Sequence, residues 1–431
     1  MASFFKNLSL NPQEVKVFRL HLVYMGIEGI ILGVLALNEF VFIKSLRGSN
    51  YELGFLFQFS MIIFLFLVFI NEFLKRVKNR KKLLRLTALL TRLPLLLVFL
   101  FPRDAETILS QNIYHYIYLG LFLIYFSGNI VIYPNINFLL KTNYSNQNFG
   151  KLYSYATSFN KVIMLVVTFI YGYLLDFDNF IFVYFLPVTG ILGVVSGFVL
   201  SNIPYPKEKA AILKKSIFQS VTDSVKEMWV ILKTNTPYRH FEGGFMLYGF
   251  SFMISVTVIT IYFYEALNLN YASVAFYRNS YNILAIVLLP FTGRLLGNID
   301  PRKFAAISYA SIAIYIFFLM TTTWFPFNFE FLGITVYYTL ILYVIFHGIF
   351  AATMVLLWNI GSAYFCKTEE SGTYQSLHLS LTGARAVFAP LLGVLFYELF
   401  GFTVTFSIAI VSLLFAMWLM RWSYKREANK L

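Results

Sequence analysis

The chain has 431 residues, of which 59% are hydrophobic and only 13% are charged. A soluble protein of this length would divide into domains and carry about twice that share of charged residues to cover them. The apolar residues also occur in long unbroken stretches, so the composition excludes an ordinary soluble fold and indicates membrane-spanning helices.

The formal net charge of +14 raises the question of a nucleic-acid partner. The positive residues lie in short loops between apolar stretches, without a basic domain, a zinc-finger pattern or an RNA-binding signature, so we expect no nucleic-acid binding. The single cysteine, Cys366, excludes an internal disulfide. No cluster of ligand residues surrounds it, and we expect neither a metal nor a cofactor. The N-terminus has no cleavable signal pattern, so the first long apolar stretch is predicted to be the first span.

Twelve apolar segments are each long enough to cross the hydrocarbon core of a bilayer as a helix. They are predicted near residues 17–38, 53–74, 83–101, 113–140, 153–175, 179–200, 243–265, 272–296, 304–323, 331–357, 375–397 and 402–421. Transmembrane β-strands would be about half as long and would alternate in polarity, and the sequence shows neither feature.

The distribution of lysine and arginine over the loops predicts the orientation of these spans. Connections after even-numbered spans are basic, most clearly at residues 75–82 and 207–239, whereas the opposite set holds Lys44, Arg47 and Arg103 among several acids. This alternation predicts that both termini lie in the cytoplasm. We expect a monomeric, multi-pass protein in the lipid bilayer of a bacterial cytoplasmic (inner) membrane.

The longest polar segment, residues 201–240, falls at the midpoint of the chain. It contains Pro204 and Pro206, and the stretch from Ile212 to Leu232 has apolar residues at helical spacing. We interpret it as a cytoplasmic linker with a helix that lies on the membrane surface. The predicted domains are an N-terminal six-helix bundle (1–200), the linker (201–240) and a C-terminal six-helix bundle (241–431).

The two halves repeat short patterns at equivalent positions. An Asn-Tyr pair precedes the second span at Asn50 and the eighth span at Asn270, and a basic loop follows each of these spans. Gly150 near the start of the fifth span has a counterpart in Gly372 near the start of the eleventh. Three matches in the same order indicate an internal duplication.

The two basic loops resemble the signature loop of the major facilitator superfamily, a glycine and an acid followed by Arg-x-Gly-Arg-Arg/Lys. The second copy keeps Gly293, Arg294, Asp300, Arg302 and Lys303, with Pro301 at the usual glycine. The first copy keeps a basic run that includes Arg76, Arg80 and Lys81, with Asn71 and Glu72 where glycine is expected. The resemblance covers essentially the whole chain. It implies an all-α membrane fold of two pseudo-symmetric six-helix bundles around a central cavity, with transport by alternating access. The basic residues of these loops are interpreted as helix-end and gating contacts.

Ionisable side chains near the middle of a span are costly and are therefore candidates for function. The candidates are Glu28, Arg92, Lys161, Arg278, His347 and Arg385, whereas His378 lies nearer the cytoplasmic edge and is left out. Because spans 5 and 11 are counterparts, Lys161 and Arg385 are predicted to approach the cavity from the two bundles. The candidates comprise one acid and four cations, so their net positive charge would attract an oxyanion. Arginine can bind such a group through two parallel hydrogen bonds.

Several roles stay open for these side chains. Glu28 is either a salt-bridge partner of Lys161 or a proton-binding group. Arg278 either contacts the substrate or extends to the outer interface, and His347 either contacts the substrate or packs between helices. Arg92, on a peripheral span, is interpreted as structural.

The leading hypothesis is a secondary transporter of a small organic or amphiphilic anion, with proton coupling through Glu28. Asn135 and Asn359 are further substrate-binding candidates, although buried amides also hold helices together. A proton-coupled multidrug exporter is the first alternative, and a non-transporting sensor or a lipid scramblase is the second. An enzyme is not expected, because no loop pairs a nucleophile with a base.

Overall fold

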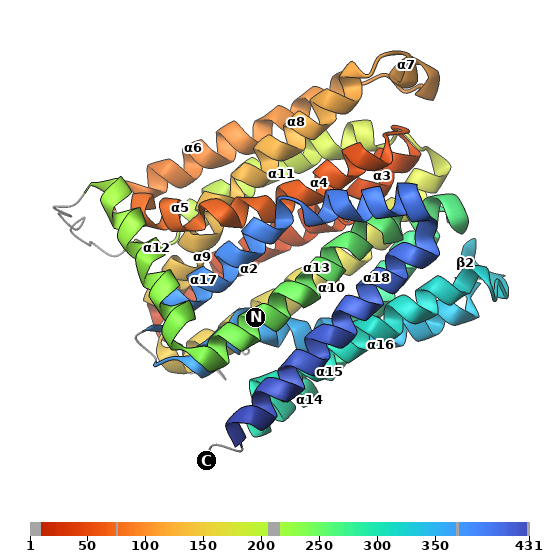
Figure 1. Ribbon diagram of the computed structural model, residues 1–431. Coiled ribbons are helices and arrows are strands. Elements are labelled where there is room, and N and C mark those ends of the chain that lie inside the picture. The colour runs from red at the N-terminus through yellow and green to blue at the C-terminus, as the bar shows by residue number, and fades with distance from the viewer. Residues whose placement is uncertain (1–9, 75, 206–215, 368–369, 429–431) are drawn as a thin grey trace. The chain divides into compact units, whose positions relative to one another are not determined.

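The computed structural model describes residues 10–74, 76–205, 216–367 and 370–428, and these residues are mostly helical (Figure 1). The helices of the first half are α2 (Pro12–Leu35), α3 (Asn38–Lys44), α4 (Asn50–Ile62), α5 (Leu67–Leu74), α6 (Arg80–Arg92), α7 (Ala105–Ser110), α8 (Ile113–Ser127), α9 (Asn129–Asn143), α10 (Asn146–Phe177) and α11 (Phe182–Ser201). The later helices are α12 (Ile217–Thr234), α13 (Thr236–Ile261), α14 (Tyr271–Asn298), α15 (Pro301–Met320), α16 (Tyr338–Ile360), α17 (Ser371–Ala386) and α18 (Ala389–Ala428). Short 3-10 segments extend α4, α6, α15 and α16, at Ile63–Phe66, Leu93–Leu100, Thr321–Thr323 and Gly361–Phe365, and a π-helical turn at Tyr262–Ala266 extends α13.

Eleven helical segments within the described ranges are long and apolar enough to cross a membrane. The last of them, Thr373–Glu427, has 55 residues, which at about 1.5 Å per residue is more than twice the thickness of a hydrocarbon core. Gly401 interrupts it with a φ of 75°, outside the helical region. The segment therefore contains the two spans predicted at 375–397 and 402–421, and the predicted all-α membrane fold is confirmed. The cytoplasmic location of the termini stays a prediction.

Local structure explains why two spans differ from their predicted limits. Helix α2 begins at Pro12, ahead of the predicted residue 17, because Asn11 and Glu14 form a capping box at its first turn. The tenth span was predicted from residue 331 but begins at Tyr338. The residues before it pair as a β-hairpin of β1 (Asn328–Phe331) and β2 (Ile334–Tyr337).

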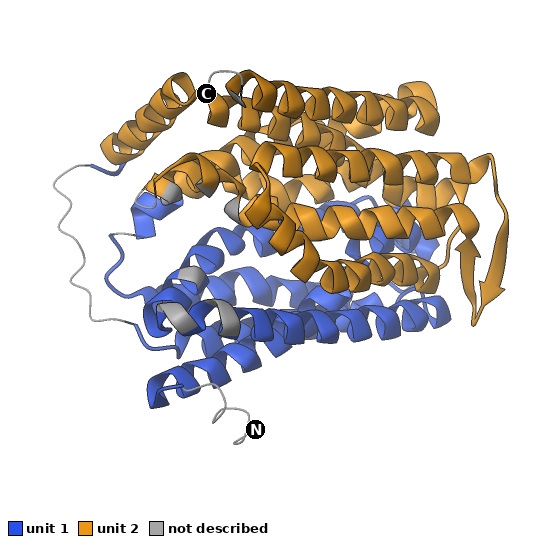
Figure 2. Ribbon diagram, turned by 90° about the horizontal axis from the view of Figure 1, so that it is seen from below, with its two compact units in different colours: residues 1–47, 69–217 blue, residues 48–68, 218–431 orange. Residues whose placement is uncertain are grey.

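The chain divides into two compact units, coloured separately in Figure 2. Unit 1 holds residues 1–47 and 69–217, and unit 2 holds residues 48–68 and 218–431. The start of the second span therefore packs with helices of the second half: a β-carbon at Gly54 would lie 3.0 Å from Leu391 of α18. The side-chain amide of Gln58 donates to the carbonyl of Val387. The division at residues 200 and 241 stays a prediction.

Two glycines of α2 bring its backbone against α10 within unit 1. A β-carbon at Gly29 would lie 2.7 Å from the carbonyl oxygen of Asn160, and one at Gly33 would lie 2.6 Å from the β-carbon of Val167. Neither distance leaves room for a side chain. The close approach is fixed by the side-chain amide of Asn160, which donates to the carbonyl of Met25 at 2.8 Å.

The helix predicted within the linker is present as α12, while residues 206–215 of the linker lie outside the described residues. Phe218, Val225 and Trp229 of α12 are exposed. Apolar side chains at this spacing suit a helix that lies on a membrane. Its place on the membrane surface stays a prediction.

Candidate functional site

Glu28 lies on the face of α2 that meets α11. Its carboxylate accepts a hydrogen bond of 2.5 Å from the hydroxyl of Ser196, and Arg92 is near enough to interact with it electrostatically. The structure does not pair Glu28 with Lys161, which was the salt-bridge alternative. The acid therefore sits in a polar site made by α2, α11 and the end of α6.

Arg92 is 4% exposed and is held by the elements that follow it in the chain. Its guanidinium donates to the carbonyl of Tyr125 at 2.6 Å and to the side-chain oxygen of Asn129 at 2.7 Å. It also lies 3.7 Å from the centre of the Tyr125 ring, a cation–π contact. Gly193 of α11 makes room, since a β-carbon there would lie 2.9 Å from the arginine side chain. Arg92 is thus a rigid positive charge beside the Glu28 site.

Lys161 lies on α10, beside the residues that contact α2. Its side chain is partly buried, and it forms no hydrogen bond or ion pair with any residue that the structure describes. Hydrocarbon and protein interiors do not stabilise a lone ammonium group. Lys161 is therefore a partly buried cation whose charge no group among the described residues compensates.

Asn135 and Asn359, the two amide candidates, differ in environment. Asn135 on α9 is fully buried; its amide nitrogen donates to the carbonyl of Val131 at 2.8 Å, and its oxygen has no partner among the described residues. Asn359 near the end of α16 is exposed and donates to the carbonyl of Val355 at 2.7 Å. Only Asn135 has a buried polar atom left to be satisfied.

In unit 2, Arg385 of α17 is 2% exposed and packs on α13. One terminal nitrogen donates to the carbonyl of Phe245 at 2.7 Å, while Nε has no partner in the described part of the chain. The guanidinium covers Gly249, where a β-carbon would lie 1.8 Å from Cζ of the arginine. Arg385 is thus buried and forms no ion pair with a carboxylate among the described residues, although Glu242 is near enough to act on it electrostatically.

A buried acid–imidazole pair lies near Arg385 and was not among the candidates. Nδ1 of His378 is 3.0 Å from the carboxylate of Glu242, and the two side chains are 1% and 4% exposed. Nε2 of His378 has no hydrogen-bond partner in the described ranges. His378 was left out because it lies near the edge of its span; on α17 it faces α13 and is buried. Glu242 was missed because its span was predicted to begin one residue later.

His347 of α16 is enclosed by tyrosines. Its ring stacks on Tyr281 at 3.7 Å between centres and on Tyr315 at 4.4 Å, with interplanar angles of 7° and 13°. Nδ1 is buried without a partner among the residues described, and Arg278 of α14 is near enough to act on the ring electrostatically. His347 thus packs between tyrosines of α14 and α15, and Arg278 lies beside the same aromatic stack.

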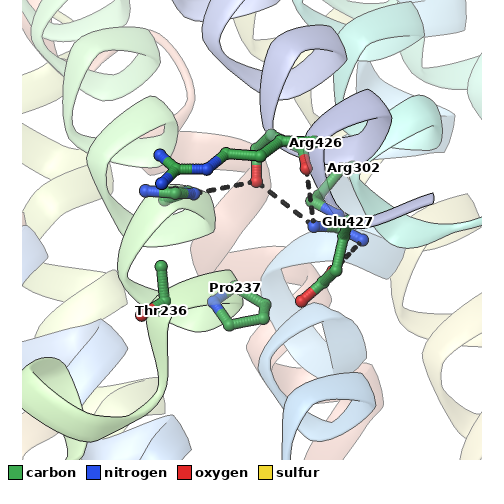
Figure 3. A pocket seen from close by; sticks show the side chains of 7 residues that line it. Thr236, Pro237, Arg302, Arg426 and Glu427 are labelled. Atoms are coloured by element: carbon green, nitrogen blue, oxygen red, sulfur yellow. Dashed lines mark hydrogen bonds and ion pairs between the residues drawn. The ribbon is translucent and has the colours of Figure 1, made fainter. Parts of the chain in front are cut away.

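The signature loop of the second half forms a compact ion network at the start of α15. Asp300 caps the helix by accepting from the backbone of Arg302, whose guanidinium lies 2.9 Å from Asp300 and 2.6 Å from Glu427 of α18. Arg302 and Glu427 line a cavity of about 60 Å³, and Thr236 and Pro237 of α13 also line it (Figure 3). The network ties the start of α15 to the end of α18.

The other loop residues lie around the helix ends. Lys303 packs 3.9 Å from the centre of the Tyr424 ring, and Arg80 lies 4.2 Å from the centre of the Phe138 ring. Gly293, Arg294 and Lys81 are exposed, and Arg76 is partly buried. Within the described ranges no group of three or more His, Cys, Asp or Glu side chains is placed to hold a metal ion.

Comparison with known proteins gives a match to the family model described as Major Facilitator Superfamily, over residues 20–336 and 243–430. No curated protein sequence matches the chain significantly. Among solved structures, the fold is similar to a variant of the nucleoside transporter NupG, with a TM-score of 0.70 and 10% identity over 96% of this chain and 100% of that chain. It is also similar to a proton-dependent oligopeptide transporter (TM-score 0.63, 13% identity, 96% of this chain and 99% of that chain). The inward-open xylose transporter XylE from E. coli gives a TM-score of 0.58 at 16% identity, over 93% of this chain and 94% of that chain.

Proposed function

Because the chain belongs to the major facilitator superfamily, and is a multi-pass membrane transporter and not an enzyme, we propose that it carries a small organic or amphiphilic anion by secondary active transport. Alternating access of two helical bundles is the mechanism that this fold supports. We place the protein in a bacterial cytoplasmic membrane, as a monomer.

The observation that carries the anion proposal is Lys161, a partly buried positive charge inside a span without a carboxylate partner in the described part of the chain. Neither Lys161 nor Arg385 forms an ion pair with an acid among the described residues, and Lys161 has no polar partner there at all. An isolated buried charge is costly, and a carboxylate, sulfonate or phosphate would compensate it. Lys161 is proposed as the primary contact and Arg385 as the second.

Four further side chains are proposed as substrate contacts with smaller roles. Asn135 has an unsatisfied oxygen, His347 has an unsatisfied nitrogen, and Arg278 lies beside the His347 stack. Asn359 is exposed at the end of α16. A cation exporter would need an acid that is free to meet its substrate, whereas Glu28 already accepts from Ser196 and faces Arg92.

A ligand screen followed by transport tests this proposal. Thermal unfolding of the purified protein against carboxylates, sulfonates, phosphates and organic cations should select an anion, since a ligand that binds the folded state raises its melting temperature. In proteoliposomes, Lys161→Met should abolish uptake of that anion and Lys161→Arg should retain part of it. Lys233→Met on α12 is the matched control and should transport normally. Anion uptake unchanged in Lys161→Met would refute the proposal.

Proton coupling is proposed to run through Glu28, the acid that one hydroxyl of α11 holds inside the first span. Two similar folds belong to a proton-dependent peptide transporter and a xylose–proton symporter, so the architecture accommodates such coupling. Glu28→Gln should abolish accumulation driven by a pH gradient and spare exchange of the anion. Glu242→Gln is the comparison: if it alone uncouples transport, the coupling acid is Glu242 and the proposal for Glu28 is wrong.

A further inference from the structure

The β-hairpin between α15 and α16 exposes an unusual concentration of aromatic side chains. The exposed apolar residues are Trp324, Phe325, Phe327, Phe329, Phe331 and Leu332, which are between 43% and 73% accessible. Glu330 is the single charged residue between positions 324 and 338. A soluble loop would not expose so much contiguous apolar surface without a partner.

One strand of the hairpin is anchored to the protein. The buried residues of β2 are Ile334 and Val336, and its backbone is bonded to the first turns of α14. The hydroxyl of Tyr277 accepts from the amide of Tyr337 and donates to the carbonyl of Thr335, both at 2.9 Å. The side-chain amide of Asn270 also reaches the carbonyl of Gly333 in the turn, at 2.8 Å. These bonds hold the hairpin in a fixed orientation.

The other strand faces away from this anchor. All four residues of β1 are exposed, whereas those of β2 alternate between buried and partly buried. The turn has a positive φ at both central residues, 52° at Leu332 and 72° at Gly333, as in the tight turns that match strand twist. Leucine is disfavoured in this region, yet it stands at the tip and is 73% exposed. Neither backbone preference nor burial within the chain explains a leucine here.

The position of the hairpin identifies its partner. It follows directly on the segment Thr321–Thr323, which ends the ninth membrane-spanning helix, and it leads directly into α16, which is itself a candidate span. Trp and Tyr concentrate at membrane interfaces, where an aromatic ring meets both apolar chains and polar headgroups. We propose that β1 and the turn lie in the headgroup region of the bilayer, with β2 as their anchor to α14, so that the hairpin fixes the depth of α15 and α16 in the membrane.

Site-directed fluorescence tests the proposal, because the chain has one cysteine to remove. In a Cys366→Ser background, Leu332→Cys carries an environment-sensitive dye, and Glu106→Cys on the exposed α7 is the matched control. Both proteins are reconstituted into phosphatidylcholine–phosphatidylglycerol vesicles. Lipids with a shallow nitroxide should quench the dye at position 332 several-fold more than the dye at 106. Iodide, present on both sides of the vesicles, should instead quench the dye at position 106 more than the dye at position 332.

A second variant separates membrane contact from general folding. Phe329→Ser combined with Phe331→Ser should make the dye at 332 accessible to iodide while the melting temperature stays unchanged. Equal access of iodide to positions 332 and 106 in the parent protein would overturn the proposal. Protection from both quenchers, together with energy transfer between labelled copies, would also overturn it, because the hairpin would then meet another protein molecule and not lipid.

Discussion

Replacing Gly249 by alanine tests the placement of Arg385 directly. The new β-carbon would lie 1.8 to 2.1 Å from the guanidinium carbon and its terminal nitrogens, so the arginine head must move. It would then lose its 2.7 Å hydrogen bond to the carbonyl of Phe245, and a hydrogen bond from a charged donor contributes about 1.5–3 kcal/mol. Alanine in place of glycine inside a helix returns about 1 kcal/mol. We expect a net destabilisation of about 0.5–2 kcal/mol.

The informative quantity is the sign of the change in the free energy of unfolding. Gly120→Ala inside α8 is the matched control, because nothing lies within 4 Å of its added β-carbon, and it should raise the melting temperature slightly. In an Arg385→Ala background the obstacle is gone, so Gly249→Ala should also become stabilising. Thermal unfolding of the four proteins of this cycle, followed by tryptophan fluorescence, measures the coupling. If Gly249→Ala stabilises the parent protein as Gly120→Ala does, then Arg385 does not pack on α13.

Three more outcomes are expected. Glu242→Gln and His378→Gln should each destabilise the protein. Because the two residues form one buried pair, the double variant should be more stable by about 1–3 kcal/mol than the sum of the two single losses predicts. Additive losses would contradict the pair. Hydrogen bonds from the hydroxyl and amide of Thr107 lower the pKa of Asp104 in the folded protein below its usual 3.8. The ionised carboxylate therefore stabilises the fold above pH 3.8, and this stabilisation is lost as the pH falls through the pKa of the folded state. Asp104→Ala should therefore lower the melting temperature at neutral pH and leave it unchanged in strong acid, and a loss of equal size at both would refute this. Gly401→Ala should destabilise by about 1–2 kcal/mol, because alanine is strained at a φ of 75°; no change in melting temperature would show that the break is absent.

The number and type of the spans followed from the sequence because a bilayer demands long apolar helices, and that demand depends on composition alone. Side-chain partners did not follow, because they depend on how each helix is rotated about its axis. Glu28 was recognised as a buried acid, but its hydrogen bond from Ser196 requires the packing of α2 on α11. Lys161 was recognised in the same way, and the packing does not pair it with Glu28, which was one of two alternatives.

Glu242 shows that a local signal was available and not used. Helix α13 begins at Thr236, where Asn235 caps the first turn and Pro237 occupies a favoured position. The polar residues that follow lower the hydropathy of this turn, so a hydropathy window places the start at 243 and leaves Glu242 in the linker. The helix-start residues place the acid within the span, whereas its pairing with His378 depends on how α13 packs on α17.

The glycines of α2 affect more than the distance between α2 and α10. One residue along a helix turns the side chain by about 100°, so a slip of α2 by a single position would swing Glu28 away from the hydroxyl of Ser196. A bulky side chain at Gly29 or Gly33 would force such a slip or a separation of the helices, because a β-carbon at either position would already lie within 3 Å of a backbone carbonyl oxygen of α10. The position of the acid thus depends on another face of its own helix, on two residues that carry no functional group. Loss of function from changes at these glycines would resemble a defect in the acid itself.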